Sequence, residues 1–175
     1  MRIGVSTLAL TPSPLAEMLE YIEALGADCC EIIYEYPLSE VEVTDSYSLE
    51  FTVHAPISDI NIASLNDTVR DASIREVESA VDLAVELDSD VVVVHPGTVP
   101  FLGMPYRDLI AERNLESLAA ISEYASERGV GVYPENMPRL EGPLLRELEE
   151  LWGVAEELGV MVTLDAAHAA TMGYS

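Results

Sequence analysis

Short apolar runs recur along this chain, and most of the segments between them show the apolar spacing of amphipathic helices. Between 66 and 87, apolar residues return every three or four positions, as in a helix that buries one face. The run VVVVHPG at 91–97 begins with four valines and does not alternate with polar residues, which is typical of a strand buried on both faces. The pattern therefore indicates short buried strands joined by helices.

Six strands and four helices are predicted from this pattern. The strands cover 2–7, 29–35, 51–56, 91–97, 130–135 and 160–165. The helices cover 15–25, 66–87, 107–128 and 142–158. Ser13 suits the N-cap of the first helix and Gly26 its end. The segment 36–49 contains Pro37 and has no helical period, so we expect an irregular connection there. Strands that alternate with helices favour an α/β fold with a parallel sheet and right-handed crossovers.

The composition predicts a single domain that spans 1–175. The 175 residues are 49% hydrophobic, enough for one core, and no linker-like tract divides them. No apolar stretch approaches about 18 residues and the amino terminus lacks a secretory signal, so we expect a soluble cytoplasmic protein without a membrane partner. Cys29 and Cys30 are adjacent and would point to opposite faces of a strand, so we expect buried free thiols.

The charge of the chain bears on its partners. Its 32 acidic residues face 8 basic ones, all of them arginine, and the formal net charge is −24. Such a surface repels phosphate backbones, which weakens the case for a nucleic-acid substrate. Acidity of this degree is also typical of proteins that work at high salt, where screening shortens the reach of each charge.

Residues with metal-ligating side chains stand where the predicted strands end. His54, His95, Glu135 and Asp165 close the third to sixth strands, and His168 follows three residues after Asp165. In parallel β/α folds the carboxyl ends of the strands share one face, so we expect the five side chains to meet there. Imidazole nitrogens and carboxylate oxygens suit zinc, manganese, iron or cobalt. The sequence therefore predicts a divalent-metal site and gives no sign of an organic cofactor.

Each of these residues also has a purely structural alternative. His54 or His95 could be a hydrogen-bonded histidine of the core, and Glu135 could be a turn residue. Asp165 could be the N-cap of a following helix. Chance would scatter such residues through helices and loops, whereas here they stand at four successive strand ends. Their joint placement favours a shared site.

The motifs VHAP, VVVHPG, YPENMP and LDAAHAATMGY resemble those of the xylose-isomerase-like barrel superfamily, which includes endonuclease IV and sugar isomerases and epimerases. The resemblance runs through essentially the whole chain and implies a parallel (β/α) TIM-type barrel. A complete member has eight strands, and about six are present here. The resemblance therefore implies a barrel truncated after the sixth strand. Either the sequence is a fragment, or another subunit of a homo-oligomer supplies the missing wall.

The resemblance also implies roles for the five residues. In the endonuclease IV pattern all five are metal ligands, and Glu135 bridges two metals. In the sugar isomerases and epimerases Glu135 and Asp165 hold one metal, with zinc or manganese expected. His168 then contacts the substrate, and His54 and His95 line the pocket. Glu135 and His168 are accordingly the expected catalytic residues.

The loops beside the expected site favour one of these activities. The segments YPLSEVEVTDSYS at 36–48 and APISDINIAS at 55–64 contain no arginine, and the only nearby arginines of note are Arg107 and Arg139, after the fourth and fifth strands. Because phosphate contacts need cationic donors, we expect a small carbohydrate-like substrate that undergoes metal-assisted proton transfer. The alternatives are an endonuclease IV-like enzyme that cleaves DNA at abasic sites with clustered zinc, and a non-catalytic truncated barrel.

Overall fold

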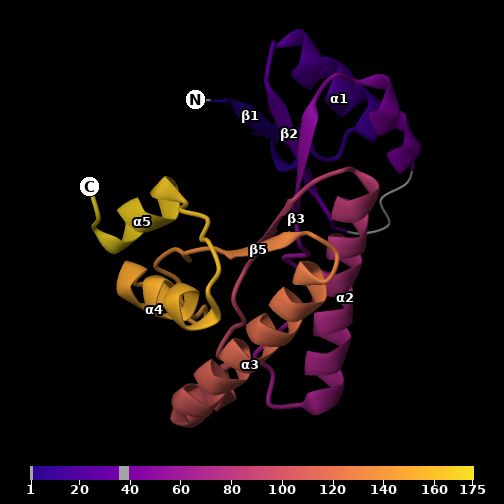
Figure 1. The fold of residues 1–175 in the computed structure, drawn as a ribbon. Coiled ribbons are helices and arrows are strands. Elements are labelled where there is room, and N and C mark those ends of the chain that lie inside the picture. The colour runs from indigo at the N-terminus through magenta and orange to yellow at the C-terminus, as the bar shows by residue number, and fades with distance from the viewer. Residues whose placement is uncertain (1, 36–39) are drawn as a thin grey trace.

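The computed structural model describes residues 2–35 and 40–175, which form a five-stranded parallel sheet with helices packed against it (Figure 1). The strands are β1 (Gly4–Ser6), β2 (Cys29–Ile33), β3 (Glu50–His54), β4 (Val91–Val94) and β5 (Gly131–Pro134). They pair in the order β1-β2-β3-β4-β5, and every pairing is parallel. The sequential parallel order confirms the fold class predicted from the sequence.

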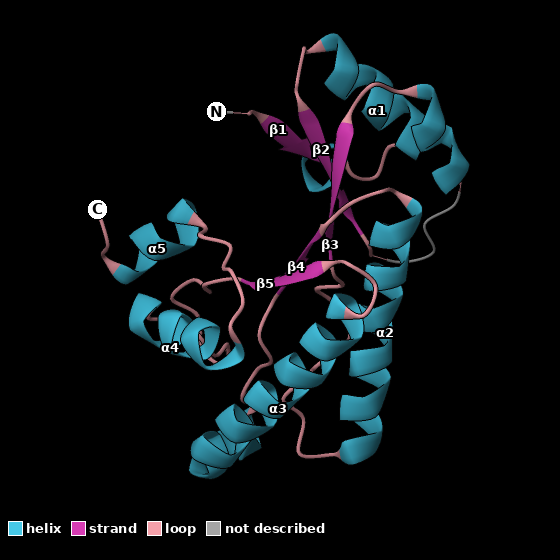
Figure 2. Ribbon diagram, in the orientation of Figure 1, coloured by secondary structure: helices cyan, strands magenta, loops and turns pink. Residues whose placement is uncertain are grey.

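Helices occupy most of the connections between strands (Figure 2). They are α1 (Leu15–Ala24), α2 (Asp67–Glu86), α3 (Arg107–Ser126), α4 (Leu148–Leu158) and α5 (Ala166–Met172). Short 3-10 helices are η1 (Thr7–Leu10), η2 (Val41–Ser46) and η3 (Phe101–Tyr106). None of the described helices is long and apolar enough to cross a membrane.

The hydrophobic core lies between the sheet and the helices. Val53 of β3 and Val92 of β4 are fully buried, and they pack in one cluster with Val81 of α2 and Ile121 of α3. The valine run of β4 is therefore covered on both faces, as its lack of alternation predicted. Both cysteines are free thiols, with Cys30 buried and Cys29 half-buried.

The predicted sixth strand at 160–165 is wrong in extent, because only one isolated parallel bridge forms, between Glu135 and Thr163. The Thr163 N–H donates to the Pro134 carbonyl at 2.9 Å. In a longer parallel ladder, the carbonyls of Met161 and Asp165, on either side of Thr163, would accept hydrogen bonds from the N–H groups of residues 134 and 138. Both positions are proline, which has no N–H, so the strand is limited to this bridge.

Two boundaries of the predicted helices also differ. The fourth helix begins at Leu148 rather than at 142, because the chain at 142–144 instead pairs with the loop after β4. The Val99 N–H donates to the Gly142 carbonyl, and Thr98 and Pro143 form an antiparallel bridge. The N-cap of α1 is Pro14 rather than Ser13, and no side chain caps it.

Two further predictions from the sequence concern Gly26 and the connection between β2 and β3. Gly26 follows the end of α1 with φ +73°, a left-handed conformation that suits glycine and ends the helix as predicted. Within the connection expected to be irregular, 36–39 lie outside the described residues, and η2 occupies Val41–Ser46.

The packing of α3 against the sheet predicts a strong dependence of stability on Ile121. Ile121 is fully buried, whereas Leu109 on the same helix is 44% exposed. We expect Ile121→Ala to lower the free energy of unfolding by about 2–5 kcal/mol, because it leaves a cavity in the core. Leu109→Ala should change it by less than about 1 kcal/mol. Urea denaturation measures both, and equal losses would contradict this description of the core.

Candidate metal centre

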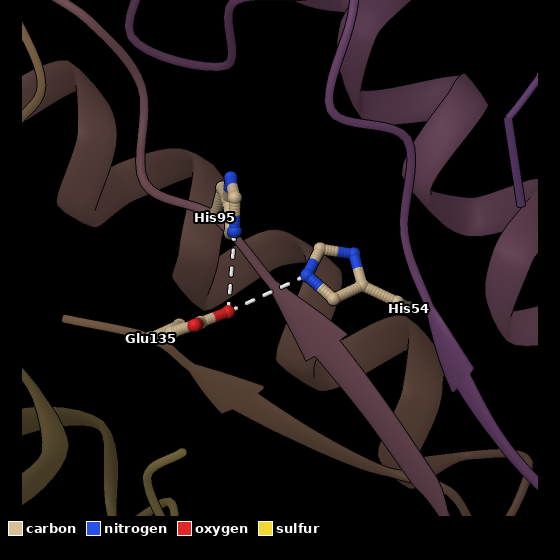
Figure 3. Close-up of side chains that lie close together, drawn as sticks. All are labelled: His54, His95 and Glu135. Atoms are coloured by element: carbon tan, nitrogen blue, oxygen red, sulfur yellow. Dashed lines mark hydrogen bonds and ion pairs between the residues drawn. The ribbon is translucent and has the colours of Figure 1, made fainter. Parts of the chain in front are cut away.

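Three of the predicted site residues meet at the carboxyl edge of the sheet (Figure 3). His54 ends β3, His95 follows β4 directly, and Glu135 follows β5 directly. Because these strands are parallel neighbours, their carboxyl ends bring the three side chains to one place. The Glu135 Oε2 atom lies 3.4 Å from His54 Nε2 and 3.1 Å from His95 Nε2. One carboxylate oxygen therefore faces two imidazoles.

This part of the site is largely closed to water. The side chains of His54 and Glu135 are only 7% and 8% exposed. The His54 and His95 rings meet edge to face, with centroids 4.7 Å apart. A buried carboxylate is unfavourable unless it is paired with positive charge, so the imidazoles or a cation between them must stabilise Glu135.

Asp165 and His168 approach the same carboxylate from the other side. The Thr163 bridge brings the chain alongside β5, and α5 then begins after Asp165. Asp165 Oδ1 accepts the His168 backbone N–H at 2.7 Å, so Asp165 is the N-cap of α5. Its other oxygen, Oδ2, lies 3.6 Å from His168 Nε2, and His168 Nδ1 lies 3.6 Å from Glu135 Oε1.

The structure thus brings all five predicted residues together, in two groups that share Glu135. His54, His95 and Glu135 form one group, and Glu135, Asp165 and His168 form the other. Within each group, the atoms able to bind a metal lie within 4.8 Å of one another. The structural alternative for Asp165 is also realised, because one carboxylate oxygen caps the helix while the other faces His168. The metal-ligating role of the five residues stays a prediction.

Backbone carbonyls fix the orientation of two imidazoles. His54 Nδ1 lies 2.7 Å from the Ala55 carbonyl oxygen, and His168 Nδ1 lies 2.8 Å from that of Asn136. Because a carbonyl only accepts, each Nδ1 carries the proton, and each neutral ring presents the lone pair of Nε2. These lone pairs face the carboxylates of Glu135 and Asp165. Two acceptors that face each other need a proton or a metal ion between them, and a carbonyl behind the ring is typical of metal-bound histidine.

The pKa values in the site reflect the same pairing. Burial is the largest influence on Glu135 and raises its pKa, but hydrogen bonds and charge from His54 and His95 outweigh it and lower the pKa from 4.5 to about 2. Burial is also the largest influence on His54 and lowers its pKa. The hydrogen bonds to Glu135 and Ala55, together with the charges of Glu31 and Glu135, outweigh it, so the pKa of His54 is raised above 6.5. The site therefore favours an ionised carboxylate beside positive charge.

Sequence reasoning missed Asn136, which is completely buried beside the site. Its side chain makes two hydrogen bonds to the backbone of Asp165, and its carbonyl holds His168. The only signals were its place directly after Glu135 and the proline at 138. Of the two arginines noted beside the strand ends, Arg107 lies 3.7 Å from Glu150 in an ion pair, whereas Arg139 is exposed.

The sequence of this chain is similar to a known family and to several known proteins. The sequence profile of the family described as xylose isomerase-like TIM barrel matches residues 18–175. An uncharacterized protein of Methanocaldococcus jannaschii is 37% identical over 99% of this chain and 63% of its own length. The probable endonuclease 4 of Mycobacterium leprae is 29% identical over 86% of this chain and 61% of its own length. The chain thus spans less than two thirds of the length of these two relatives.

Solved structures agree with this relationship. The crystal structure of a D-tagatose 3-epimerase-like protein superimposes with a TM-score of 0.89 at 34% identity, over 98% of this chain and 67% of that protein. A D-psicose 3-epimerase solved in the presence of D-fructose gives a TM-score of 0.80 at 18% identity, over all of this chain and 67% of that protein. At 18% identity, the similarity to the D-psicose 3-epimerase shows that the two chains share a fold.

The two shifted pKa values predict how the site contributes to stability in metal-free protein. The raised pKa of His54 gives a contribution that is present below pH 6.5 and lost as the pH rises through the folded value. The lowered pKa of Glu135 gives a contribution that is present above pH 4.5 and lost as the pH falls through about 2. The pair should therefore contribute most between pH 4.5 and 6.5.

Urea denaturation of metal-free Glu135→Gln, measured near pH 5.5 and pH 8, tests this prediction. The stability lost relative to wild type should be larger at the lower pH, because His54 is then charged. Glu156→Gln, which changes an exposed glutamate of α4, should show the same small difference at both values. A loss from Glu135→Gln that is equal at both pH values would contradict the assignment.

Proposed function

Because this chain belongs to the xylose isomerase-like TIM barrel family, we propose that it is a divalent-metal-dependent epimerase or isomerase of a small sugar or related hydroxy-carbonyl compound. The observation that carries the proposal is the buried, ionised carboxylate of Glu135 between the imidazoles of His54, His95 and His168. It lies at the carboxyl ends of the strands, where barrel enzymes hold their active sites. The likeness to a D-tagatose 3-epimerase-like protein supports the reaction class.

The donor set fits a divalent cation. Three imidazoles and two carboxylates suit zinc and manganese, and the ring orientations of His54 and His168 leave Nε2 available. The residues that would hold a cation are His54, His95 and Glu135 in one group, and Glu135, Asp165 and His168 in the other. When bound, a cation of this kind supplies Lewis-acid polarisation of substrate oxygens and stabilises the negative charge that develops during proton transfer.

The side chains of the site differ in their exposure to solvent. His168 and Asp165 have side chains 25% and 30% exposed, whereas those of His54 and Glu135 are nearly closed to solvent. The side of the site at Asp165 and His168 is therefore the more open one, and we expect a substrate to approach Glu135 from there. His54 and His95 lie deeper and hold the charge of Glu135 in place.

Proton transfer at a carbon beside a carbonyl needs a base on one face of the substrate and an acid on the other. Glu135 has a pKa of about 2 and is ionised at every physiological pH. It can therefore act as the base, but it carries no proton to donate as the acid before the reaction begins. We expect the second acid–base group from another part of the complete barrel, since the chain spans about two thirds of the length of the epimerase-like protein.

The charges of the chain favour an uncharged sugar over a sugar phosphate. The chain has no lysine. Within the part of the chain that the structure describes, five of the eight arginines form ion pairs with acidic side chains. Phosphate recognition depends on cationic donors that are free to bind the ligand. Ketoses such as those named for the similar epimerases carry no phosphate, and they fit this surface better.

Solvent exchange tests the proposed reaction. In D₂O, protein from the complete reading frame, loaded with Mn²⁺, should incorporate deuterium at the carbon beside the carbonyl of a ketose and form its epimer. Glu135→Gln should lower this rate by about 100-fold or more, because it removes both a ligand and a base. Glu156→Gln on α4 should retain the wild-type rate. A Glu135→Gln protein that still exchanges deuterium at the wild-type rate would rule out the proposed role.

A second candidate, hydrolysis of phosphodiesters at abasic sites with clustered metals, is favoured by one observation. The two groups of metal-binding residues share Glu135, whose carboxylate has two oxygens. This arrangement suits a carboxylate that bridges two ions. The 29% identity to a probable endonuclease 4 is consistent with it, whereas the charge of −24 is unfavourable for DNA.

Metal counting separates the two candidates. On the sugar-epimerase proposal, elemental analysis of the protein from the complete reading frame should find one metal per chain. A duplex with an abasic site should remain uncleaved from low to molar salt. Two or more metals per chain together with efficient cleavage would instead favour the nuclease.

A further inference from the structure

The segment that carries Asp165 lies beside β5 without a continuous backbone ladder. After the Thr163 N–H has bonded to the Pro134 carbonyl, the regular pattern would pair the Asp165 N–H with the Asn136 carbonyl. It would also pair the Asp165 carbonyl with an N–H at position 138, which is Pro138 and has none. A backbone ladder alone would therefore leave the Asp165 carbonyl without a donor.

The side chain of Asn136 instead pairs with both backbone groups of Asp165. The Asp165 N–H donates to Asn136 Oδ1 at 2.8 Å, and Asn136 Nδ2 donates to the Asp165 carbonyl at 2.9 Å. A primary amide has the same donor and acceptor pair as a backbone peptide, so it can continue the ladder in place of the backbone. Asn136 is completely buried, which makes each of these bonds costly to lose.

This replacement frees the backbone carbonyl of Asn136. Instead of accepting a hydrogen bond from Asp165, the carbonyl oxygen lies 2.8 Å from Nδ1 of His168 and accepts a hydrogen bond from it. The neutral ring then presents Nε2 to Asp165 Oδ2, at 3.6 Å. Asp165 in turn caps α5, the helix that carries His168. Asn136 thus contacts Asp165 through its side chain and His168 through its backbone.

From these contacts, we infer that Asn136 is a positioning residue, which sets the placement of Asp165 and the tautomer of His168 for the metal. The inference rests on the proposed function only in naming a metal as the group that the two side chains hold. Asn136 itself does not act on substrate. Its side-chain amide replaces the backbone in the pairing with Asp165, so its backbone carbonyl remains free to accept a hydrogen bond from the His168 imidazole.

The chain offers a matched control in Asn61. Its side chain makes the same reciprocal pair with the backbone of Thr98, because Nδ2 donates to the Thr98 carbonyl at 2.9 Å and Oδ1 accepts the Thr98 N–H at 3.0 Å. Neither Asn61 nor Thr98 belongs to the five predicted site residues. Loss of the amide at position 61 should therefore affect local stability without changing His168.

The first measurement uses the wild-type chain without metal. At a pH where its ring is neutral, nitrogen NMR should show His168 as a single tautomer with the proton on Nδ1. The side-chain N–H protons of Asn136 should exchange slowly with water, because Nδ2 is bonded and buried. A His168 ring that carries its proton on Nε2, or a mixture of tautomers, would overturn the inference without any substitution.

The second measurement compares Asn136→Ala and Asn136→Asp with Asn61→Ala and Asn61→Asp. In Asn136→Ala the Asp165 N–H can take the carbonyl at position 136, so His168 should become a mixture of tautomers. Asn136→Asp keeps an acceptor but loses the donor to the Asp165 carbonyl. Both should weaken Zn²⁺ affinity, measured by competition titration, by about 10–100-fold. The substitutions at position 61 should leave affinity and tautomer unchanged.

The outcomes separate this inference from the proposed function. Wild-type Zn²⁺ affinity and a single tautomer in folded Asn136→Ala would overturn the positioning role, as would an equal loss of affinity in Asn61→Ala. If the tautomer and affinity change as expected but no sugar is epimerised, the proposed function fails and the positioning role stands. If Asn136→Ala does not fold, Asn136→Asp and the wild-type NMR measurement still decide the question.

Discussion

The buried negative charge of Glu135 is the constraint on which the rest of the site depends. A carboxylate removed from water at this depth is stable only beside positive charge, and hydrogen bonds and charge from His54 and His95 lower its pKa to about 2 against the effect of burial. His54 and His95 face one of its oxygens, and His168 approaches the other. Because His54 directs a lone pair toward this carboxylate when its ring is neutral, the arrangement calls for a proton or a metal ion between them. The proposed metal chemistry follows from that requirement.

The fold meets this requirement in two different ways. Parallel neighbouring strands place His54, His95 and Glu135 together simply because β3, β4 and β5 end at one edge of the sheet. The chain that carries Asp165 has only one bridge to β5, at Thr163, and depends on side-chain hydrogen bonds for its position. The first half of the site is thus held by the sheet itself, whereas the second half is held by an amide and the start of a helix.

Much of the fold could be predicted because the signals are periodic. The valine run of β4 and the helical spacing at 66–87 each agreed with the structure, and the placement of metal-ligating residues at strand ends brought all five together. The sixth strand was overestimated, because the apolar run at 160–165 carries no information about the prolines of its partner strand. The role of Asn136 was likewise hidden, since it depends on which neighbour takes each hydrogen bond.

The central claim is that Glu135 and the surrounding imidazoles hold a divalent metal, and anomalous X-ray diffraction tests it most directly. Crystals grown with Mn²⁺ or Zn²⁺ and measured at the absorption edge of that metal should show a strong anomalous peak within bonding distance of the Glu135 carboxylate and at least one of the three histidines. A peak that lies only on surface carboxylates, with His54, His95 and Glu135 still in direct contact with one another, would contradict the account.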